Sequence, residues 1–112
     1  MGMKPSLTVS LGRLTLRNPV VVASGTFGSS DEYAGLVKYN ALGGIITKSI
    51  TLEARTGNRP PRVCETASGM LNAIGLENKG VDHFIEKIVP YYASVKAALI
   101  ASIAGSTAEE YE

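Results

Sequence analysis

The chain has the composition of one small globular domain. Of its 112 residues, 45% are hydrophobic and 19% are charged, which argues against a disordered segment. The 11 basic and 10 acidic side chains leave a net charge of +1, so a protein that coats nucleic acid is not expected. The single cysteine excludes an internal disulfide, and neither it nor the single histidine has neighbours at metal-ligand spacing.

Targeting and membrane signals are missing from the sequence. No apolar run approaches the roughly 20 residues that a membrane-spanning helix needs. The first ten residues lack the charged and then apolar layout of a signal peptide. We therefore expect a cytoplasmic protein that binds neither membrane nor metal.

The first 50 residues predict a hairpin, a buried strand, a helix and a second buried strand. Apolar residues alternate through Leu7–Leu16 around a Gly-Arg pair, as in a β-hairpin. Pro19–Ala23 is a continuous apolar run, typical of a parallel strand that is buried on both faces. Ser29 and Glu32 have capping-box spacing, which predicts a helix reaching about residue 39. Residues 45–47 then form the second buried strand.

The second half of the chain alternates in the same way. Residues 50–78 show no sustained period and are predicted to be a long, ordered, functional loop. Val81–Tyr92 has apolar residues at helical spacing, with Pro90 inside the pattern, so we expect a helix with a kink or an early stop there. Ala98–Ala101 predicts a third buried strand. Alternating strands and helices indicate an α/β fold with a parallel sheet.

The end of the sequence predicts a longer protein. Ser106 and Glu109 have capping-box spacing, which predicts the start of another helix. Only three residues follow Glu109 in the sequence. Three parallel strands would also leave an unpaired apolar sheet edge. We expect the segment to be the N-terminal part of a larger (β/α) protein, the alternative being a frayed C-terminal tail.

Polar residues follow each buried strand, where parallel α/β proteins bind their ligands. They are Ser24 and Gly25, then Lys48 and Ser49, then Ser102. Lys48 is the strongest candidate for a functional residue among them. A part-buried ammonium is costly unless an anion lies beside it. Its aliphatic stem could equally carry the charge out to water. The residues alone leave these two interpretations open.

Other motifs carry weaker signals. Asn72 and Asn78 flank Gly75, and their side chains could form hydrogen bonds with an amide-rich planar ligand. Asparagine more often stabilises turns, however. Gly25 and Gly28 have the spacing of a phosphate cradle but lack a third glycine. The three arginines of the loop are interleaved with acids and are expected to be solvated, as is His83, and Cys64 is expected to be structural.

Several motifs together resemble a known family. They are Ala-Ser-Gly-Thr-Phe-Gly at residues 23–28, Thr-Lys-Ser at 47–49, Gly-Asn-Arg-Pro-Pro-Arg at 57–62 and Gly-Met-Leu-Asn-Ala-Ile-Gly-Leu-Glu-Asn at 69–78. In this order they resemble the catalytic subunit of dihydroorotate dehydrogenase, most of all its NAD-linked class 1B form. The resemblance covers essentially the whole chain.

The resemblance implies a fold, a reaction and a set of site residues. The family is an FMN-containing (β/α)8 TIM barrel that oxidises dihydroorotate to orotate in pyrimidine biosynthesis, and residues 1–112 would be the N-terminal segment of that one domain, preceded by the β-hairpin. The flavin would be approached by Ala23, Ser24, Gly25, Lys48, Ser49 and Ser102. The substrate would be held by Lys48, Asn72, Ala73, Ile74, Gly75 and Leu76. A lysine there can stabilise negative charge on the reduced flavin.

The resemblance also implies a partner subunit. The chain differs from the family pattern in two respects. Electrons would pass to NAD through a partner subunit carrying FAD and a 2Fe–2S cluster, in a homodimer or heterotetramer. Ser102 stands where the family has an asparagine that touches flavin. The family's catalytic cysteine, which acts as the base, would lie beyond Glu112, so no catalytic residue is assigned within the chain and the segment alone is expected to be inactive.

Two alternatives remain at this point. The first is another FMN-barrel oxidoreductase acting on pyrimidines, such as a dihydropyrimidine dehydrogenase-like enzyme. The second is a non-catalytic assembly fragment.

Overall fold

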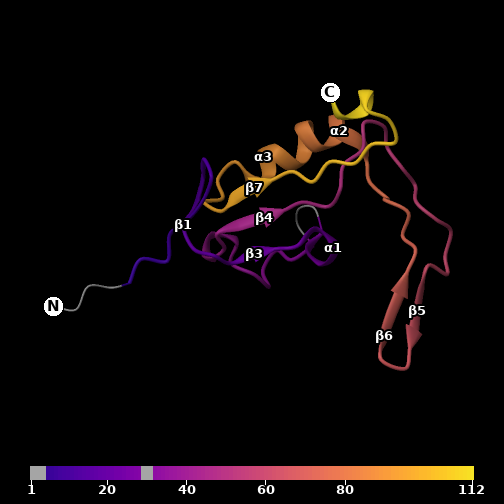
Figure 1. Ribbon diagram of the computed structural model, residues 1–112, viewed down its shortest axis with the longest axis horizontal. Coiled ribbons are helices and arrows are strands. Elements are labelled where there is room, and N and C mark those ends of the chain that lie inside the picture. The colour runs from indigo at the N-terminus through magenta and orange to yellow at the C-terminus, as the bar shows by residue number, and fades with distance from the viewer. Residues whose placement is uncertain (1–4, 29–31) are drawn as a thin grey trace.

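The computed structural model describes residues 5–28 and 32–112, and its centre is a small parallel sheet (Figure 1). The sheet contains β3 (Val21–Val22), β4 (Gly44–Ile46) and β7 (Ala98–Ile100) in that order. β4 pairs in parallel with both neighbours, with Ile45 opposite Val22 and Leu99. Parallel strands therefore form at all three predicted places. β3 and β7 are shorter than their apolar runs, β4 begins one residue earlier than predicted, and only β4 contains fully buried residues.

An antiparallel pair precedes this sheet. β1 (Val9–Leu11) pairs with β2 (Leu14–Leu16) across a two-residue connection. Gly12 in that connection has φ +58°, a left-handed conformation that glycine adopts without steric cost. Leu16 is the residue of this pair that reaches the interior, with 2% of its surface exposed.

One helical segment covers one face of the sheet. It comprises α2 (Gly80–His83), a π-helical turn at Phe84–Ile88 and α3 (Val89–Tyr92) without a break. The predicted helix is thus confirmed. The wider π-helical turn ends at Ile88, two residues before Pro90, which has no N–H to donate to the preceding turn.

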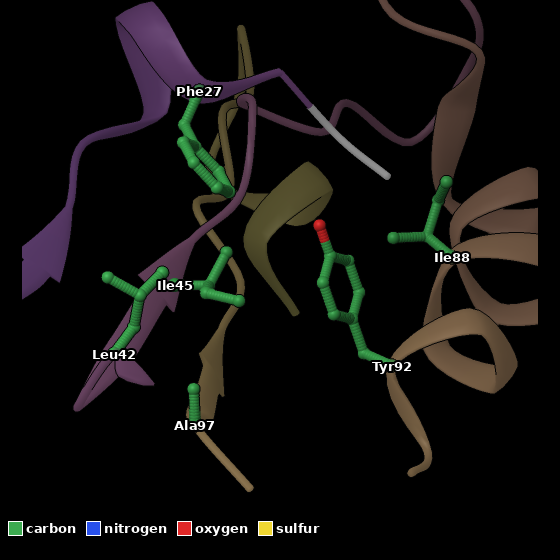
Figure 2. Close-up of a cluster of buried hydrophobic side chains, with 6 residues drawn as sticks. All are labelled: Phe27, Leu42, Ile45, Ile88, Tyr92 and Ala97. Atoms are coloured by element: carbon green, nitrogen blue, oxygen red, sulfur yellow. The ribbon is translucent and has the colours of Figure 1, made fainter. Parts of the chain in front are cut away.

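The hydrophobic core lies between this helix and the sheet (Figure 2). Ile45 is only 1% exposed, since alternate residues of a strand point to opposite faces and its face is the covered one. Leu42, Ile88, Tyr92 and Ala97 pack with it. We call β3, β4, β7 and residues 80–92 the sheet–helix unit.

The segment between β3 and β4 differs from the prediction. α1 (Ser24–Phe27) begins directly after β3, and a 3₁₀ turn, η1 (Tyr39–Ala41), precedes β4. The capping-box start at Ser29 lies outside the described residues. From residue 32 to residue 38 the chain forms turns and no helix, because Gly35 has φ +85°, which a right-handed helix cannot contain.

The predicted long loop is a paired arm. β5 (Val63–Thr66) and β6 (Gly69–Asn72) form an antiparallel hairpin, and Arg55 bridges Asn78 at its base. We call residues 55–78 the arm; it extends away from the end of the sheet at which the parallel strands finish (Figure 1). Every residue of the two strands is exposed, which is why no hydrophobic period marked them.

The C-terminal capping box does not form as predicted, because the last turn follows Ala108 without a side-chain cap. The carboxylate of Glu110, and not that of Glu109, accepts the hydrogen bond from the Ser106 amide. The last element is a single 3₁₀ turn, η3 (Glu109–Tyr111). Hydrogen bonds from its own backbone amide and from the Thr107 hydroxyl lower the pKa of the exposed Glu109 carboxyl.

Candidate functional site

The carboxyl ends of the three parallel strands bring the predicted polar residues to one edge of the sheet. Ser24 begins α1 immediately after β3, Lys48 and Ser49 follow β4, and Ser102 follows β7. All four side chains are half-buried. In parallel α/β folds this edge is where ligands bind.

Two of these residues are in direct contact. Ser49 Oγ and Ser102 Oγ lie 3.1 Å apart, so the ends of β4 and β7 carry a linked pair of hydroxyls. The amide of Ser102 also donates to the buried Thr47 hydroxyl at 3.3 Å. These bonds fix the position of the Ser102 backbone relative to β4.

The backbone around this pair is regular on both sides of it. Thr47 N donates to Ile100 O at 3.0 Å, and pairing resumes where Ile50 N donates to Ser102 O at 2.8 Å. Lys48 and Ser49 occupy the interval between these two bonds. The backbone of Lys48 and Ser49 is consequently held by the strand pairing on either side.

Lys48 and Ser49 line a cavity of about 610 Å³ between the strand ends, the base of the arm and the start of the helix. Cationic groups dominate its charged lining, since Lys48, Arg55 and Lys79 outnumber Glu32 and Glu77. The remaining lining residues are Ser49, Ile50, Ala54, Thr56, Asn78, Gly80, His83, Phe84 and Ile88. A volume of this size suits a small-molecule ligand.

The segment Asn72–Leu76 lies elsewhere. Asn72 and Ala73 line a second cavity of about 380 Å³ along the hairpin, together with Arg62 and Leu71 among others. The expectation that Lys48 and Asn72 share one pocket is thus not met in this structure. β5 and β6 form a hairpin that extends away from the sheet (Figure 1), and Asn72 is the last residue of β6, paired with Val63.

The backbone of that segment is nevertheless fixed. Asn58 donates from its backbone N to Ile74 O at 3.0 Å and from its side-chain Nδ2 to Ala73 O at 2.7 Å. A Cβ at Gly75, where φ is +79°, would lie 3.0 Å from the Asn58 side chain. Only glycine permits this close approach, so Asn58 is a residue that sequence reasoning missed and that orders the segment.

Several minor predictions change. The Gly28 turn is no phosphate cradle, because the Glu32 carboxylate occupies the space beside it, 2.8 Å from where a Cβ would stand. Arg62 is not simply solvated, since it forms an ion pair with Glu77. His83 is half-buried and lines the larger cavity. Cys64 is exposed on β5, away from the cavity that Lys48 lines.

Metal and membrane features are absent from the described part of the chain. Within residues 5–28 and 32–112 no three His, Cys, Asp or Glu side chains gather as metal ligands would. None of the helices described there is long and apolar enough to cross a bilayer. The chemistry available at the strand ends is that of hydroxyls, one ammonium and backbone amides.

Fold and site together define an α/β protein with a candidate ligand site at the carboxyl ends of parallel strands. A structure of DHODH from Eimeria tenella in complex with ferulenol shares this fold, with a TM-score of 0.61 and 21% identity over 89% of this chain and 28% of that one. The model of the dihydroorotate dehydrogenase family matches residues 6–112. The chain therefore belongs to the dihydroorotate dehydrogenase family.

Relatives refine the family assignment. The chain is 50% identical over 108 residues to a Geobacter sulfurreducens protein named dihydroorotate dehydrogenase B (NAD(+)), catalytic subunit. It is 48% identical over 105 residues to the Bacteroides thetaiotaomicron protein of the same name. These alignments cover 96% and 94% of this chain, but only 35% of each relative. The chain thus spans about a third of the length of the relatives that it matches.

Proposed function

We propose that this chain is part of the catalytic subunit of an NAD-linked dihydroorotate dehydrogenase, which oxidises dihydroorotate to orotate. The observation that carries the proposal is the family match over residues 6–112, joined to a polar strand-end edge of the kind that such chemistry needs. Residues 1–112 would then belong to one (β/α)8 barrel.

The uncovered face of the sheet supports a barrel. Val21 and Ile46 are half-exposed and alternate with the residues that face the helix, so they point to the opposite side. Parallel sheets are normally covered on both faces, because their crossover helices and neighbouring strands bury them. Further strands closing into a barrel would cover this side.

The strand-end residues fit FMN by their chemistry. The linked hydroxyls of Ser49 and Ser102 offer donors and acceptors to a heterocyclic ring. Open space lies beside the Gly25 backbone, where a Cβ would meet no atom within 4 Å. In the proposed site Ala23, Ser24 and Gly25 approach the flavin from β3, while Lys48, Ser49 and Ser102 approach it from β4 and β7.

Each residue then has a defined task. FMN, when bound, supplies the hydride acceptor. The Lys48 ammonium attracts the substrate carboxylate. It also stabilises negative charge on the reduced flavin. In the proposal Asn72 and the backbone of residues 73–76 hold the pyrimidine ring, although Asn72 lines the second cavity and not the one that Lys48 lines. We assign no base within the chain and place the proton acceptor in the remainder of the proposed subunit.

The partner follows from the same proposal. Dihydroorotate oxidation releases two electrons that must reach NAD. We propose that a second subunit carrying FAD and a 2Fe–2S cluster conveys them, in a heterotetramer built on a catalytic homodimer.

The test uses the complete protein purified with its bound flavin. Anaerobic addition of dihydroorotate should bleach the flavin absorbance and form orotate, whereas dihydrouracil should do neither. Bleaching by dihydrouracil with none by dihydroorotate would instead indicate a different pyrimidine oxidoreductase. Absence of any bound flavin would reject the proposal.

The variant Lys48→Ala tests the role proposed for Lys48. Loss of an ammonium from a site of charge development should lower kcat/KM for dihydroorotate about 100-fold. Lys96→Ala is the matched control, because Lys96 is exposed at the start of β7, at the opposite end of the sheet, and should leave kcat/KM within about threefold. Equal activities of the two variants would contradict the role of Lys48.

A further inference from the structure

Asn78 occupies the point at which the arm rejoins the sheet–helix unit. Its backbone N donates to Arg55 O at 2.9 Å, and Arg55 N donates back to Asn78 O at 2.8 Å. Two residues later α2 begins at Gly80. The residue therefore stands between the arm, the helix and the chain that continues from β4.

The carboxamide of Asn78 uses its whole hydrogen-bonding capacity. Oδ1 accepts from Gly80 N at 2.9 Å and from Thr51 N at 3.2 Å. Nδ2 donates to Leu76 O at 2.8 Å and to Thr51 Oγ1 at 2.9 Å. An amide has two acceptor lone pairs and two donor hydrogens, so four of its four places are filled.

The surroundings explain why an asparagine is needed there. Thr51 is only 2% exposed, and Gly80 is buried with φ +83°, where a Cβ would stand 3.0 Å from Ala54 N. An aspartate could accept both amide hydrogens but could donate to neither oxygen. An unpaired polar group beside the buried Thr51 costs more than a missing contact at an exposed surface.

One of the four bonds supports a strained residue. Leu76 has φ +55°, and among residues 5–28 and 32–112 it is the one non-glycine residue in the left-handed region. This conformation is unfavourable for a residue with a side chain and persists only where the surroundings enforce it. The bond from Asn78 Nδ2 to Leu76 O supplies part of that enforcement.

We propose that Asn78 is a positioning residue, which locks the exit of the Asn72–Leu76 segment to the chain just beyond Lys48 and Ser49. Thr51 lies two residues after Ser49, so one carboxamide joins the proposed substrate segment to the proposed flavin edge. This inference rests on the proposed function for its effect on catalysis. Its structural part, the ordering of residues 72–78, stands independently.

A local turn alone does not account for the contacts. The Asx turn before α2 requires one acceptor oxygen toward Gly80 N, a task that Asp or Ser would also perform. Both donor hydrogens instead reach oxygens outside this contact, at Leu76 and Thr51. Asn78→Asp separates the two roles, because it keeps the acceptor oxygen and removes both donated bonds.

The experiment measures Asn78→Asp and Thr51→Val in the complete flavin-loaded enzyme. Thr51→Val keeps the shape of the side chain and removes the oxygen that accepts from Nδ2. We expect each variant to raise KM for dihydroorotate about tenfold with kcat within about threefold, because binding geometry is lost while the reacting groups remain. Amide hydrogen exchange of residues 72–78 should accelerate in parallel.

Asn40→Ala is the matched control. Asn40 Oδ1 accepts from Lys96 N at 2.7 Å, at the opposite end of the sheet, so its loss removes a comparable bond outside the site. KM should not change in this variant. Bound flavin and thermal midpoint, measured for all three proteins, show whether each remains folded.

The outcomes are distinct. Unchanged KM together with unchanged exchange in folded Asn78→Asp overturns the proposal. A fall in kcat that follows flavin loss or unfolding in both variants also overturns it, because the role is then only structural. If the parent enzyme does not turn over dihydroorotate, the proposed function fails, and exchange of residues 72–78 still decides whether Asn78 orders the segment.

Discussion

The sheet–helix unit and the arm are stabilised by different interactions. In the sheet–helix unit buried side chains face one another, and Ile45 at its centre is 1% exposed. In the arm, backbone pairs and side-chain amides hold two strands whose residues are all exposed. Burial of apolar side chains therefore stabilises the sheet–helix unit, which carries the strand-end residues. Local hydrogen bonds and glycines determine the shape of the arm.

The largest difference should appear when one apolar side chain is truncated in each region. Ile45→Ala should lower the free energy of unfolding by about 2–5 kcal/mol, because it leaves a cavity in the core. Leu71→Ala removes a side chain of similar size that is 66% exposed and should change stability by about 0.5 kcal/mol or less. Urea unfolding of the complete protein measures both, and equal losses would contradict the distinction.

A glycine substitution should break the arm selectively. Gly57 has φ +70°, and a Cβ there would stand 2.4 Å from Ile74 O, so alanine cannot be accommodated without separating the two sides of the arm. We expect Gly57→Ala to cost about 2 kcal/mol locally, from left-handed strain plus the clash, and to make residues 56–77 sensitive to protease.

Gly12→Ala is the control for conformational strain alone. Gly12 has φ +58°, but a Cβ there would meet no atom within 4 Å. This variant should cost about 1 kcal/mol and leave the arm resistant to protease. A protease pattern identical in both variants would show that the close approach to Ile74 has no role.

The smallest expected effect concerns the ion pair of the arm. Arg62 and Glu77 have side chains that are 26% and 42% exposed, so solvent screens much of their attraction. Glu77→Gln should lower the free energy of unfolding by less than about 1 kcal/mol, and added salt should reduce the difference. Glu65→Gln, an exposed acid on β5, should show no such salt dependence; a loss of several kcal/mol at Glu77 would contradict this estimate.

Parts of the fold were predictable because burial leaves a pattern in the sequence. The runs around Val21, Ile45 and Leu99 predicted three parallel strands, and the apolar spacing from Val81 to Tyr92 predicted the helix. The helix expected through Gly35 was wrong where the structure describes it, because one glycine with positive φ outweighed a favourable apolar spacing. The backbone conformation of Gly35, and not the apolar spacing, therefore determines that residues 32–38 form turns.

The candidate site was predicted in part. Strand ends identified Lys48, Ser49 and Ser102, and the structure places the two serine hydroxyls 3.1 Å apart. The arm was not anticipated, because exposed strands carry no hydrophobic period. The positioning roles of Asn58 and Asn78 were also hidden, since a carboxamide's partners depend on which backbone groups the fold brings near.

The amino-acid sequence by itself determined the order of strands and helix, because those elements bury apolar side chains and burial requires a matching period. It also determined the family, through motifs that the chain carries in register. Only the tertiary structure decided that Asn72 lies in a different cavity from Lys48. The reason is physical: backbone pairing in the arm sets its direction, and hydrogen bonds between backbone groups are available to almost any sequence.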